Sequence, residues 1–455
     1  MKNWLPQRQP YLRSHPLRTR SLTLSPPAVL ALGFLGLVLV GCLLLLLPIS
    51  THKPITVLQA LFTSTSAVTV TGLVVLDTGS QFTLFGQFVI ALLIQAGGLG
   101  FMTFAIVAAI SLGVKIGLSQ QKIAQEALNQ TSLAQVAQTA KAVLFYSVAI
   151  ELIGIFLLTL VWWPEYGFTK ALYRGFFYTI SAFNNAGFAL NNDSLMQYAG
   201  NIPVNLVITS LFIIGGIGFS VLIDLKRHRH WYQLSTNTRV ILLATLIINT
   251  LAFFLIWLLE ANNPETLGSM PVKEQVLAAW FQAVTPRTAG FNTLDYSTMT
   301  DASNILTLLL MFIGGGSLST ASGIKLGTFV ILIMATYTFL RRRDEVTIMQ
   351  RTVPHSQVLK ALALVFISMG FVFISTFVLS ITEQASLLDV AFEVVSALST
   401  VGLSRGLTAE LSSPGQFLII ILMITGRLGP LTLAYFLATP QKKRIRYAET
   451  RIQIG

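Results

Sequence analysis

Long apolar runs alternate with shorter, partly polar segments along almost the whole chain. A bilayer span needs about 20 apolar residues in a helix, and eight runs meet that length. They predict helices near residues 28–48, 81–113, 140–162, 201–225, 239–259, 303–340, 358–381 and 414–438. Each consecutive pair of helices encloses a segment that is too short to span and that suits a half-helix followed by a few extended residues. These segments lie near 55–72, 171–187, 274–290 and 387–402.

The four short segments end alike, with one glycine followed by an apolar residue. The endings are Ser66–Leu73, Ser181–Phe188, Val284–Phe291 and Ser396–Leu403, and their glycines are Gly72, Gly187, Gly290 and Gly402. In three of them a Ser-Ala pair begins six residues before the glycine, whereas the third has Val-Thr there. A lone glycine in an apolar run is usually a packing or hinge residue. Four occurrences in one order instead indicate one unit repeated four times.

A second glycine cluster follows each of these endings inside the next apolar run. The clusters are Gly97-Gly98, Gly215-Gly216, Gly314-Gly315-Gly316 and Gly426-Arg427-Leu428-Gly429, and each lies 24 to 29 residues after the first glycine. Because this spacing also recurs four times, it supports the same repeated unit.

The predicted fold is an all-α polytopic membrane protein. Four pseudo-repeated helix–pore loop–helix units, with eight transmembrane helices and four re-entrant pore helices, surround a central pore. The predicted boundaries are a cytoplasmic N-terminal tail 1–27, repeat 1 at 28–115, repeat 2 at 138–230, repeat 3 at 238–345, repeat 4 at 356–440 and a cytoplasmic C-terminal tail 441–455.

The composition supports a membrane protein and excludes several other classes. Hydrophobic residues make up 53% of the chain and charged residues only 11%, whereas soluble proteins carry about 25% charged residues. The single cysteine, Cys42, excludes an intramolecular disulfide and a site with several cysteine ligands. The first apolar run is longer than the core of a secretory signal, so we expect its stretch 29–47 to be a retained helix.

The positions of the basic residues explain the net charge of +12. Of the 30 Lys and Arg residues, 22 lie in the tails and loops on one predicted side and six on the other, with Lys325 and Arg427 inside spans. Basic residues accumulate on the cytoplasmic side of membrane proteins. Both termini are therefore predicted to be cytoplasmic and the glycine endings to face outside, and nucleic-acid binding is not expected.

This layout predicts a pore for a small monovalent cation. Non-helical backbone at membrane depth must be buried in protein or line a water-filled cavity. Four such segments around one axis present rings of carbonyl oxygens, which replace the water around a cation in K⁺ filters. Glycine permits the backbone angles that turn carbonyls toward an axis. The β-branched residues before Gly72 and Gly402, among them Val70 and Thr400, predict extended strands there.

The same residues carry a family resemblance. The sequence Thr69-Val70-Thr71-Gly72-Leu73 resembles a K⁺-channel filter strand. The stretches 183–188 and 286–291 resemble the Trk/Ktr/HKT superfamily of cation transporters, and the likeness covers residues from about 28 to 440. Within that superfamily the chain is most similar to the membrane subunits of bacterial Ktr systems, because it has no room for the two additional N-terminal helices of Trk-type subunits.

The resemblance implies a function and partners. It implies a pore-forming subunit for K⁺ uptake across the bacterial plasma (inner) membrane, dependent on Na⁺, with K⁺ and Na⁺ as transported or coupling ions and no cofactor in this chain. It also implies a homodimer with one pore per subunit, controlled by a cytosolic nucleotide-binding ring of the KtrA type. Plant-type relatives with Ser at the first filter position tend to favour Na⁺, and the four glycines here favour K⁺.

The predicted site has two parts. The selectivity filter, with K⁺ at its backbone carbonyls, comprises Val70, Thr71, Gly72, Asn185, Ala186, Gly187, Thr288, Ala289, Gly290, Thr400, Val401 and Gly402. The gate is an intramembrane loop at 314–323 together with Arg427, and its members are Gly314, Gly315, Gly316, Ser317, Thr320, Ser322 and Gly323. This run of small residues forms a poor helix, and the family has an intramembrane loop there. Close packing of small residues is the alternative.

Several charged residues lie within predicted spans or half-helices. Arg427 is expected to face the pore beneath the filter or to pair with the gate, with a buried ion pair as the alternative. Lys325 either reaches the cytoplasmic side or takes part in the gate. Glu151 is expected to make a structural polar contact between helices rather than to couple ions. Asp389 and Glu393 either bond to filter backbone or attract cations.

Other functions are less consistent with the pattern. A Na⁺-selective or non-selective cation transporter of the same fold is the nearest alternative. A secondary transporter of an organic solute often has inverted repeats, but each unit here has two full spans, so successive units keep one orientation. The predicted spans hold no catalytic Ser/His/Asp set or His-Glu-x-x-His motif, and we expect no enzyme.

Overall fold

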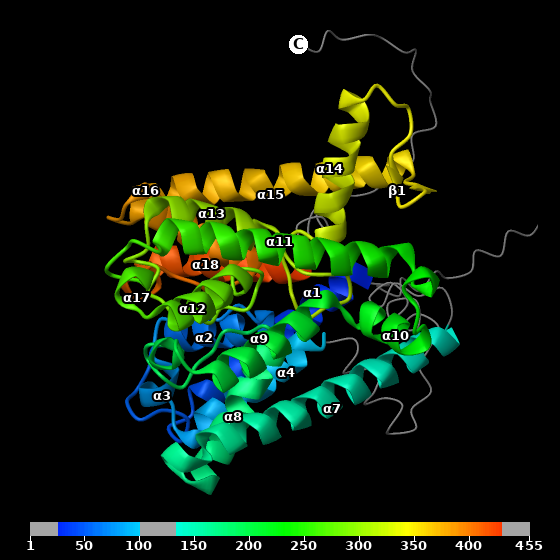
Figure 1. The fold of residues 1–455 in the computed structure, drawn as a ribbon. Helices are drawn as coiled ribbons and strands as arrows, with labels where there is room; N and C mark the ends of the chain where they lie inside the picture. The colour runs from blue at the N-terminus through cyan, green and yellow to red at the C-terminus, as the bar shows by residue number, and fades with distance from the viewer. Residues whose placement is uncertain (1–25, 101–132, 430–455) are drawn as a thin grey trace, which may run out of the picture.

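The computed structural model describes residues 26–100 and 133–429. Outside these residues lie positions 1–25 of the predicted N-terminal tail 1–27, the predicted C-terminal tail 441–455, most of the first inner loop and the ends of the predicted helices 81–113 and 414–438. Nearly all of the regular structure that is described is helical (Figure 1). A two-stranded hairpin of β1 (Thr347–Ile348) and β2 (Arg351–Thr352), with Thr347 opposite Thr352, follows helix α14 (Leu326–Leu340).

The main helices follow one another in four similar groups. The first group holds α1 (Pro26–Leu45), α2 (Val57–Thr69) and α4 (Leu84–Gly98), and the second holds α7 (Leu133–Tyr166), α8 (Phe168–Phe183), α9 (Ile202–Ile217) and α10 (Phe219–Arg227). The third holds α11 (Thr236–Glu260), α12 (Val272–Val284), α13 (Asp301–Phe312) and α14 (Leu326–Leu340), and the fourth holds α15 (His355–Thr382), α16 (Leu387–Ser399) and α18 (Ser413–Leu428). The short helices are α3 (Thr78–Gln81), α17 (Leu407–Glu410), η1 (Met196–Tyr198), η2 (Trp231–Gln233) and η3 (Leu267–Ser269).

Polar residues between the apolar runs start the helices. Thr56 and Gln59 form a capping box at α2, in which each side chain accepts a hydrogen bond from the other residue's backbone N–H. Ser386 caps α16 and Ser412 caps α18 through their hydroxyl oxygens. These caps satisfy N–H groups that have no partner inside the helix. Polar side chains therefore fix where these three helices begin.

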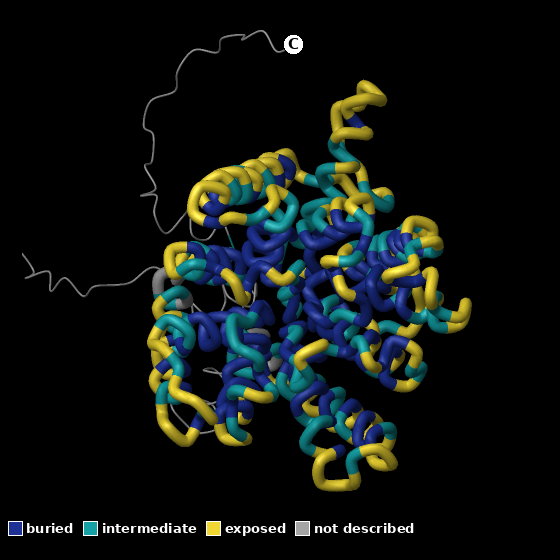
Figure 2. Tube along the Cα trace, turned by 90° about the vertical axis from the view of Figure 1, so that its left-hand side faces the viewer, coloured by how far each residue is buried: buried dark blue, intermediate teal, exposed yellow. Residues whose placement is uncertain are grey.

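The long helices are apolar enough to cross a membrane. In the described ranges, three helices reach the necessary length and hydropathy, at Thr139–Tyr166, Thr236–Glu260 and His355–Thr382, or four spans if the bent pair α9–α10 is one span. Along α15, Phe366 is 80% exposed, Phe373 is 75% exposed and Ile381 is 71% exposed. Large exposed apolar side chains along a helix suit contact with lipid. Figure 2 shows that exposed residues lie at the periphery of the bundle, whereas its centre is buried.

The four half-helices α2, α8, α12 and α16 lead into that buried centre. From Phe62 to Leu73, and from Phe392 to Val401, every residue is buried. α2 packs between α1 and α4, and α16 packs between α15 and α18. Many of these buried residues are polar, which is costly unless each polar group finds a partner. The centre of the molecule is therefore where the polar contacts of the chain matter most.

The predicted continuous helix at 201–225 is wrong. α9 ends at Ile217 and α10 begins at Phe219, and the two helices meet at 91°. Gly218 between them has a φ of +103°, and a Cβ there would overlap the carbonyl oxygen of Ser317. The N–H of Phe219 donates to the carbonyl oxygen of Leu318 at 2.8 Å. The bend follows because the non-helical segment after α13 occupies the path that a straight helix would take.

The predicted helix near 303–340 is also interrupted. α13 ends at Phe312, and α14 starts at Leu326 and runs across the direction of α11 and α15 (Figure 1). The intervening segment 313–325, here called the central loop, is held at its ends by a parallel bridge between Ile313 and Ile324. The predicted gate residues 314–323 all lie in this loop.

Candidate functional site

The four glycines of the repeated endings meet at one place. A Cβ added to Gly72 would lie 3.2 Å from the Cα of Gly187, and one added to Gly187 would lie 2.8 Å from the Cα of Gly290. A Cβ added to Gly402 would lie 3.0 Å from the Cα of Gly72. All four have φ between +69° and +93°, where glycine avoids a steric penalty. Both the backbone angle and the lack of space therefore require glycine.

A carbonyl oxygen of one repeat lies against the glycine of another at each of these positions. In every case it belongs to the residue just before a glycine. Ala186 O lies against Gly72, Ala289 O against Gly187, Val401 O against Gly290 and Thr71 O against Gly402. The four contacts close a ring, because each repeat supplies one oxygen and receives one. Sequence positions more than 300 residues apart thus form a single ring of backbone oxygens and glycines.

The residue two positions before each glycine has a left-handed backbone. The φ values are 58° at Val70, 60° at Asn185, 72° at Thr288 and 49° at Thr400. The predicted extended strands at Val70 and Thr400 are therefore wrong at these residues. Each of the two is the left-handed cap of its half-helix, a common way to end a helix. A β-branched residue in this region is strained, and such strain persists only where the surroundings fix the backbone.

A cavity of about 640 Å³ opens from the ring of glycines. The four glycines line it together with residues of the loops that follow each half-helix. Asp77, Asp193 and Asp295 are among these residues, from the first three repeats. Carboxylates around the mouth of a cavity attract cations. The sequence analysis missed these three aspartates, although each lies five or six residues after its repeat's glycine.

The second glycine clusters pack against the ends of the half-helices. A Cβ at Gly97 would overlap the carbonyl oxygen of Val68, and one at Gly215 would overlap that of Phe183. In the fourth repeat a Cβ at Gly426 would overlap the carbonyl oxygen of Leu398. Each of these carbonyls lies four residues before its repeat's ring glycine. The second glycine therefore lets the following helix approach the last turn of its own half-helix.

The third repeat departs from this pattern because its second glycines belong to the central loop. A Cβ at Gly314 would overlap the carbonyl oxygen of Ser322, within the loop itself. The N–H of Gly316 donates to the carbonyl oxygen of Gly216 at 2.8 Å. The loop thus replaces a close helix contact by backbone hydrogen bonds to the second repeat.

The central loop contacts the second repeat's ending directly. The Thr320 hydroxyl lies 2.9 Å from Asn185 Oδ1 and 3.2 Å from the carbonyl oxygen of Phe183. Asn185 is one of the four residues with a left-handed backbone, two positions before Gly187. Movement of the loop would therefore break contacts with the backbone that leads into the ring of glycines.

Arg427 holds the central loop to α4. Its guanidinium donates to the carbonyl oxygen of Thr320 at 2.6 Å and to the Ser322 hydroxyl at 3.1 Å. It also donates to the carbonyl oxygens of Gly98, at 3.2 Å, and Gly97. Its partners among the described residues are thus carbonyl and hydroxyl oxygens rather than a carboxylate, so the alternative of a buried ion pair is wrong there.

Lys325 lies at the end of the same loop. Its Nζ donates to the carbonyl oxygen of Ala321 at 2.7 Å. The side chain therefore folds back on the central loop. Lys325 and Arg427 thus both donate to carbonyl oxygens of the central loop.

Glu151 of α7 makes a polar contact between helices. Gln95 Nε2 of α4 donates to both Glu151 carboxylate oxygens, at 2.8 and 3.1 Å. Asn184 Nδ2, beside the second ending, donates to Gln95 Oε1 at 2.7 Å. Burial of a carboxylate requires such donors. The contact joins α4 and α7 to the backbone before Gly187.

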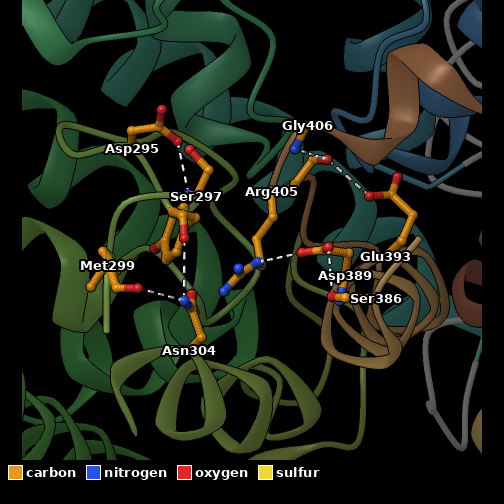
Figure 3. Close-up of polar contacts among 11 residues, drawn as sticks. Asp295, Ser297, Met299, Asn304, Ser386, Asp389, Glu393, Arg405 and Gly406 are labelled. Carbon is orange, nitrogen blue, oxygen red and sulfur yellow. Dashed lines mark hydrogen bonds and ion pairs between the residues drawn. The ribbon is translucent and has the colours of Figure 1, made fainter. Parts of the chain in front are cut away.

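Asp389 and Glu393 hold the loop that follows the fourth ending (Figure 3). Glu393 accepts hydrogen bonds from the hydroxyls of Ser404, at 2.9 Å, and Thr408. Asp389 Oδ1 pairs with Arg405 Nε at 2.6 Å. Burial raises the pKa of Asp389, but hydrogen bonds from Ser386 and the Arg405 charge outweigh burial and lower it below its ordinary value. Of the two alternatives for these carboxylates, bonding to filter backbone is wrong among the described residues, because the partners of both carboxylates lie outside the predicted filter. Attraction of cations stays a prediction.

Known proteins resemble this chain over nearly its full length. The family model described as TrkH, cation transport protein, matches residues 37–447. The chain is 48% identical to Ktr system potassium uptake protein B of Bacillus subtilis, over 95% of this chain and 97% of that protein. It is 43% identical to the protein of the same name from Vibrio alginolyticus, over 94% and 95% of the two chains.

Two further comparisons extend the likeness. The chain is 37% identical to potassium/sodium uptake protein NtpJ of Enterococcus hirae, over 95% of this chain and 98% of that protein. The crystal structure of the potassium transporter TrkH from Vibrio parahaemolyticus matches with a TM-score of 0.74 and 21% identity, over 94% and 86% of the two chains. That match shows a shared fold. The family match and the high identities confirm the resemblance predicted from the sequence, and the chain therefore belongs to the TrkH family of cation transport proteins.

Proposed function

We propose that this chain is the pore-forming subunit of a K⁺ uptake system of the plasma membrane. The observation that carries the proposal is the ring of four glycines and four carbonyl oxygens, one of each from every repeat. Carbonyl oxygens replace the hydration shell of K⁺ in known filters. The names of the relatives, potassium uptake protein B and potassium/sodium uptake protein, support K⁺ as the ion.

In the proposed arrangement eight helices span the membrane in four pairs. The pairs are α1 with α4, α7 with α9–α10, α11 with α13–α14, and α15 with α18, and the half-helices are α2, α8, α12 and α16. Each half-helix points its C-terminal end at the ring, where its partial negative charge favours a cation. Both termini face the cytoplasm, as the basic residues predict.

K⁺ enters from the outer cavity in this mechanism. Asp77, Asp193 and Asp295 raise the local cation concentration at the mouth. The ion then exchanges water for the carbonyl oxygens of the proposed filter, whose residues are those predicted from the sequence. Positions Gly72, Gly187, Gly290 and Gly402 keep the four strands close enough for one ion to contact all of them.

The central loop acts as the gate in this proposal. It contacts Asn185 on its outer side through Thr320, and Arg427 binds its carbonyl oxygens. A loop that is held by a few side-chain contacts and by backbone hydrogen bonds can be released without unfolding a helix. The positive charges of Arg427 and Lys325 hinder a cation that passes while the loop is in place.

Three further features belong to the proposal through the relatives. The Ktr systems named among them support assembly with a regulatory subunit, proposed here as a cytosolic nucleotide-binding ring. NtpJ is named a potassium/sodium uptake protein, which supports a dependence on Na⁺. A homodimer with one pore in each subunit completes the arrangement.

Ion uptake in a cell that lacks its own K⁺ uptake systems tests the function. Expression of the chain with its regulatory subunit should restore growth at low external K⁺. Single Gly→Ser changes at positions 72, 187, 290 and 402 should each reduce the preference for K⁺ over Na⁺, because the added side chain displaces a carbonyl of the ring. Uptake that is equal for the two ions in the unmodified chain would favour a non-selective cation transporter instead.

A further inference from the structure

A fully buried hydroxyl lies behind the glycine ring in every repeat. The four residues are Ser66, Ser181, Thr285 and Ser396, and each has an exposed fraction of 0%. Each lies near the C-terminal end of its half-helix and bonds to backbone of its own ending. The Ser-Ala pairs of the sequence supply three of these hydroxyls. The repeat pattern thus has a physical cause beyond the glycine itself.

In the first and fourth repeats the hydroxyl accepts a hydrogen bond from the ring glycine. The N–H of Gly72 donates to Ser66 Oγ at 3.0 Å, and the N–H of Gly402 donates to Ser396 Oγ at 3.1 Å. In a trans peptide the N–H and the preceding C=O point in opposite directions. Each bond therefore turns the carbonyl before the glycine away from the half-helix and toward the neighbouring glycine of the ring.

In the second and third repeats the hydroxyl donates instead. Ser181 Oγ bonds to the carbonyl oxygen of Phe188 at 2.8 Å, and Thr285 Oγ1 bonds to that of Phe291 at 2.5 Å. These carbonyls follow the ring glycines, and the bonds turn them back toward the half-helices. The carbonyl oxygens of Phe188 and Phe291 therefore point away from an ion at the ring.

The third repeat indicates that the buried hydroxyl has a specific hydrogen-bonding role and does more than fill space. Its hydroxyl lies five residues before the glycine rather than six, because Val284 occupies the usual position. α12 ends at Val284, whereas α2 and α16 continue to three residues before their glycines. Thr285 nevertheless makes the same bond as Ser181. The hydroxyl therefore makes the equivalent hydrogen bond, although its position relative to the ring glycine is shifted by one residue.

We infer that these four hydroxyls are positioning residues that set which backbone oxygens face the ion, and so determine the preference for K⁺. This inference rests on the proposed function. It divides the ring into two kinds of repeat. In the first and fourth repeats the glycine N–H is anchored, and in the second and third the carbonyl after the glycine is anchored. The loss of one hydroxyl then frees one peptide group to rotate, whereas the helix around it keeps its shape.

The test compares variants of the full chain with its regulatory subunit, by competition between K⁺ and Na⁺ in uptake assays normalised to the amount of protein in the membrane. Thr285→Val removes the hydroxyl but keeps the shape, and Thr285→Ser keeps the hydroxyl. Ser396→Ala tests the other kind of repeat. A lost hydrogen bond of ordinary strength corresponds to about a fivefold change. We expect Thr285→Val and Ser396→Ala to reduce the K⁺ over Na⁺ preference by about that factor, and Thr285→Ser to restore most of it.

Ser64→Ala is the matched control. Ser64 lies on the same half-helix as Ser66 and is also fully buried, but it donates to the carbonyl oxygen of Val38 in α1 at 2.7 Å. Its loss should leave the ion preference unchanged. A preference that is unaltered in both Thr285→Val and Ser396→Ala overturns the inference, whereas an unmodified chain that takes up no K⁺ overturns the proposed function. If Thr285→Val does not accumulate in the membrane, Ser396→Ala decides alone.

Discussion

At the scale of single residues, small side chains determine how closely the four repeats approach one another. The ring glycines allow strands to meet, and the second glycines allow the following helices to touch the half-helix ends. A methyl group at a ring glycine, or at Gly97, Gly215 or Gly426, would overlap a backbone atom that cannot easily move. The cost of such overpacking is typically about 1–3 kcal/mol. The two sets of glycines therefore contribute to stability as well as to the site.

Gly97→Ala should destabilise the protein, because its Cβ would overlap the carbonyl oxygen of Val68. We expect a loss of about 1–3 kcal/mol, seen as a lower midpoint when the purified protein is heated and its folded fraction is followed by size-exclusion chromatography. Gly370→Ala in α15 is the control, since no described atom lies within 4 Å of its added Cβ. That change should leave the midpoint unchanged or raise it. Equal midpoints for both variants would contradict the packing argument.

At the scale of elements, the predicted spans are confirmed in part. Three helices of the described ranges are long and apolar enough to cross a membrane, or four if the bent pair α9–α10 is one span. The predicted helices at 201–225 and 303–340 are each interrupted. The glycine endings were found from their recurrence, and the four glycines do lie together. The backbone at Val70 and Thr400 was predicted wrongly, because β-branched propensity was overridden by the need to end each half-helix. The bend at Gly218 depends on the central loop, which lies about 100 residues away in sequence. Local patterns carry no information about such contacts.

Polar partners were the least predictable part of the site. Glu393 binds hydroxyls of the outer loop, and Arg427 binds carbonyls of the central loop and of α4. Which oxygen a buried charge meets is set by the packing of distant elements rather than by neighbours in sequence. Asp77, Asp193 and Asp295 are different, since each follows its ring glycine by five or six residues and this recurrence is present in the sequence itself.

Shortening the central loop should raise K⁺ flux if the loop is the gate. A variant that lacks residues 317–322 loses Thr320 and the Arg427 contacts with the loop. We expect faster K⁺ efflux from loaded proteoliposomes without any regulatory subunit, because the barrier below the ring is removed. The control is the unmodified chain at equal protein per vesicle. Flux equal to that control would remove the gate from the proposal and leave the loop a packing element.

At the scale of the whole molecule, charge is arranged in one direction. The outer cavity carries three aspartates at its rim, and most basic residues lie in the tails and loops on the opposite predicted side. In the proposed arrangement the central loop, which Arg427 and Lys325 bind, lies between the ring and that basic side. In the proposed direction of uptake, a cation passes from negative to positive potential, and the ring has to bind it well enough to offset this change. The direction of the chain in the membrane is therefore part of the mechanism.

Thiol labelling tests this direction, because the chain has one cysteine, Cys42, and it is buried. A cysteine at Asn192, which is exposed and lines the outer cavity, should react with a membrane-impermeant maleimide added to intact cells. A cysteine at Tyr232, which is 72% exposed in the loop after α10, should react only after the membrane is opened. The unmodified chain should remain unlabelled in both conditions. Labelling of Tyr232→Cys in intact cells, with Asn192→Cys protected, would reverse the orientation and place the aspartate-lined cavity inside the cell, where it would guide K⁺ outward rather than inward.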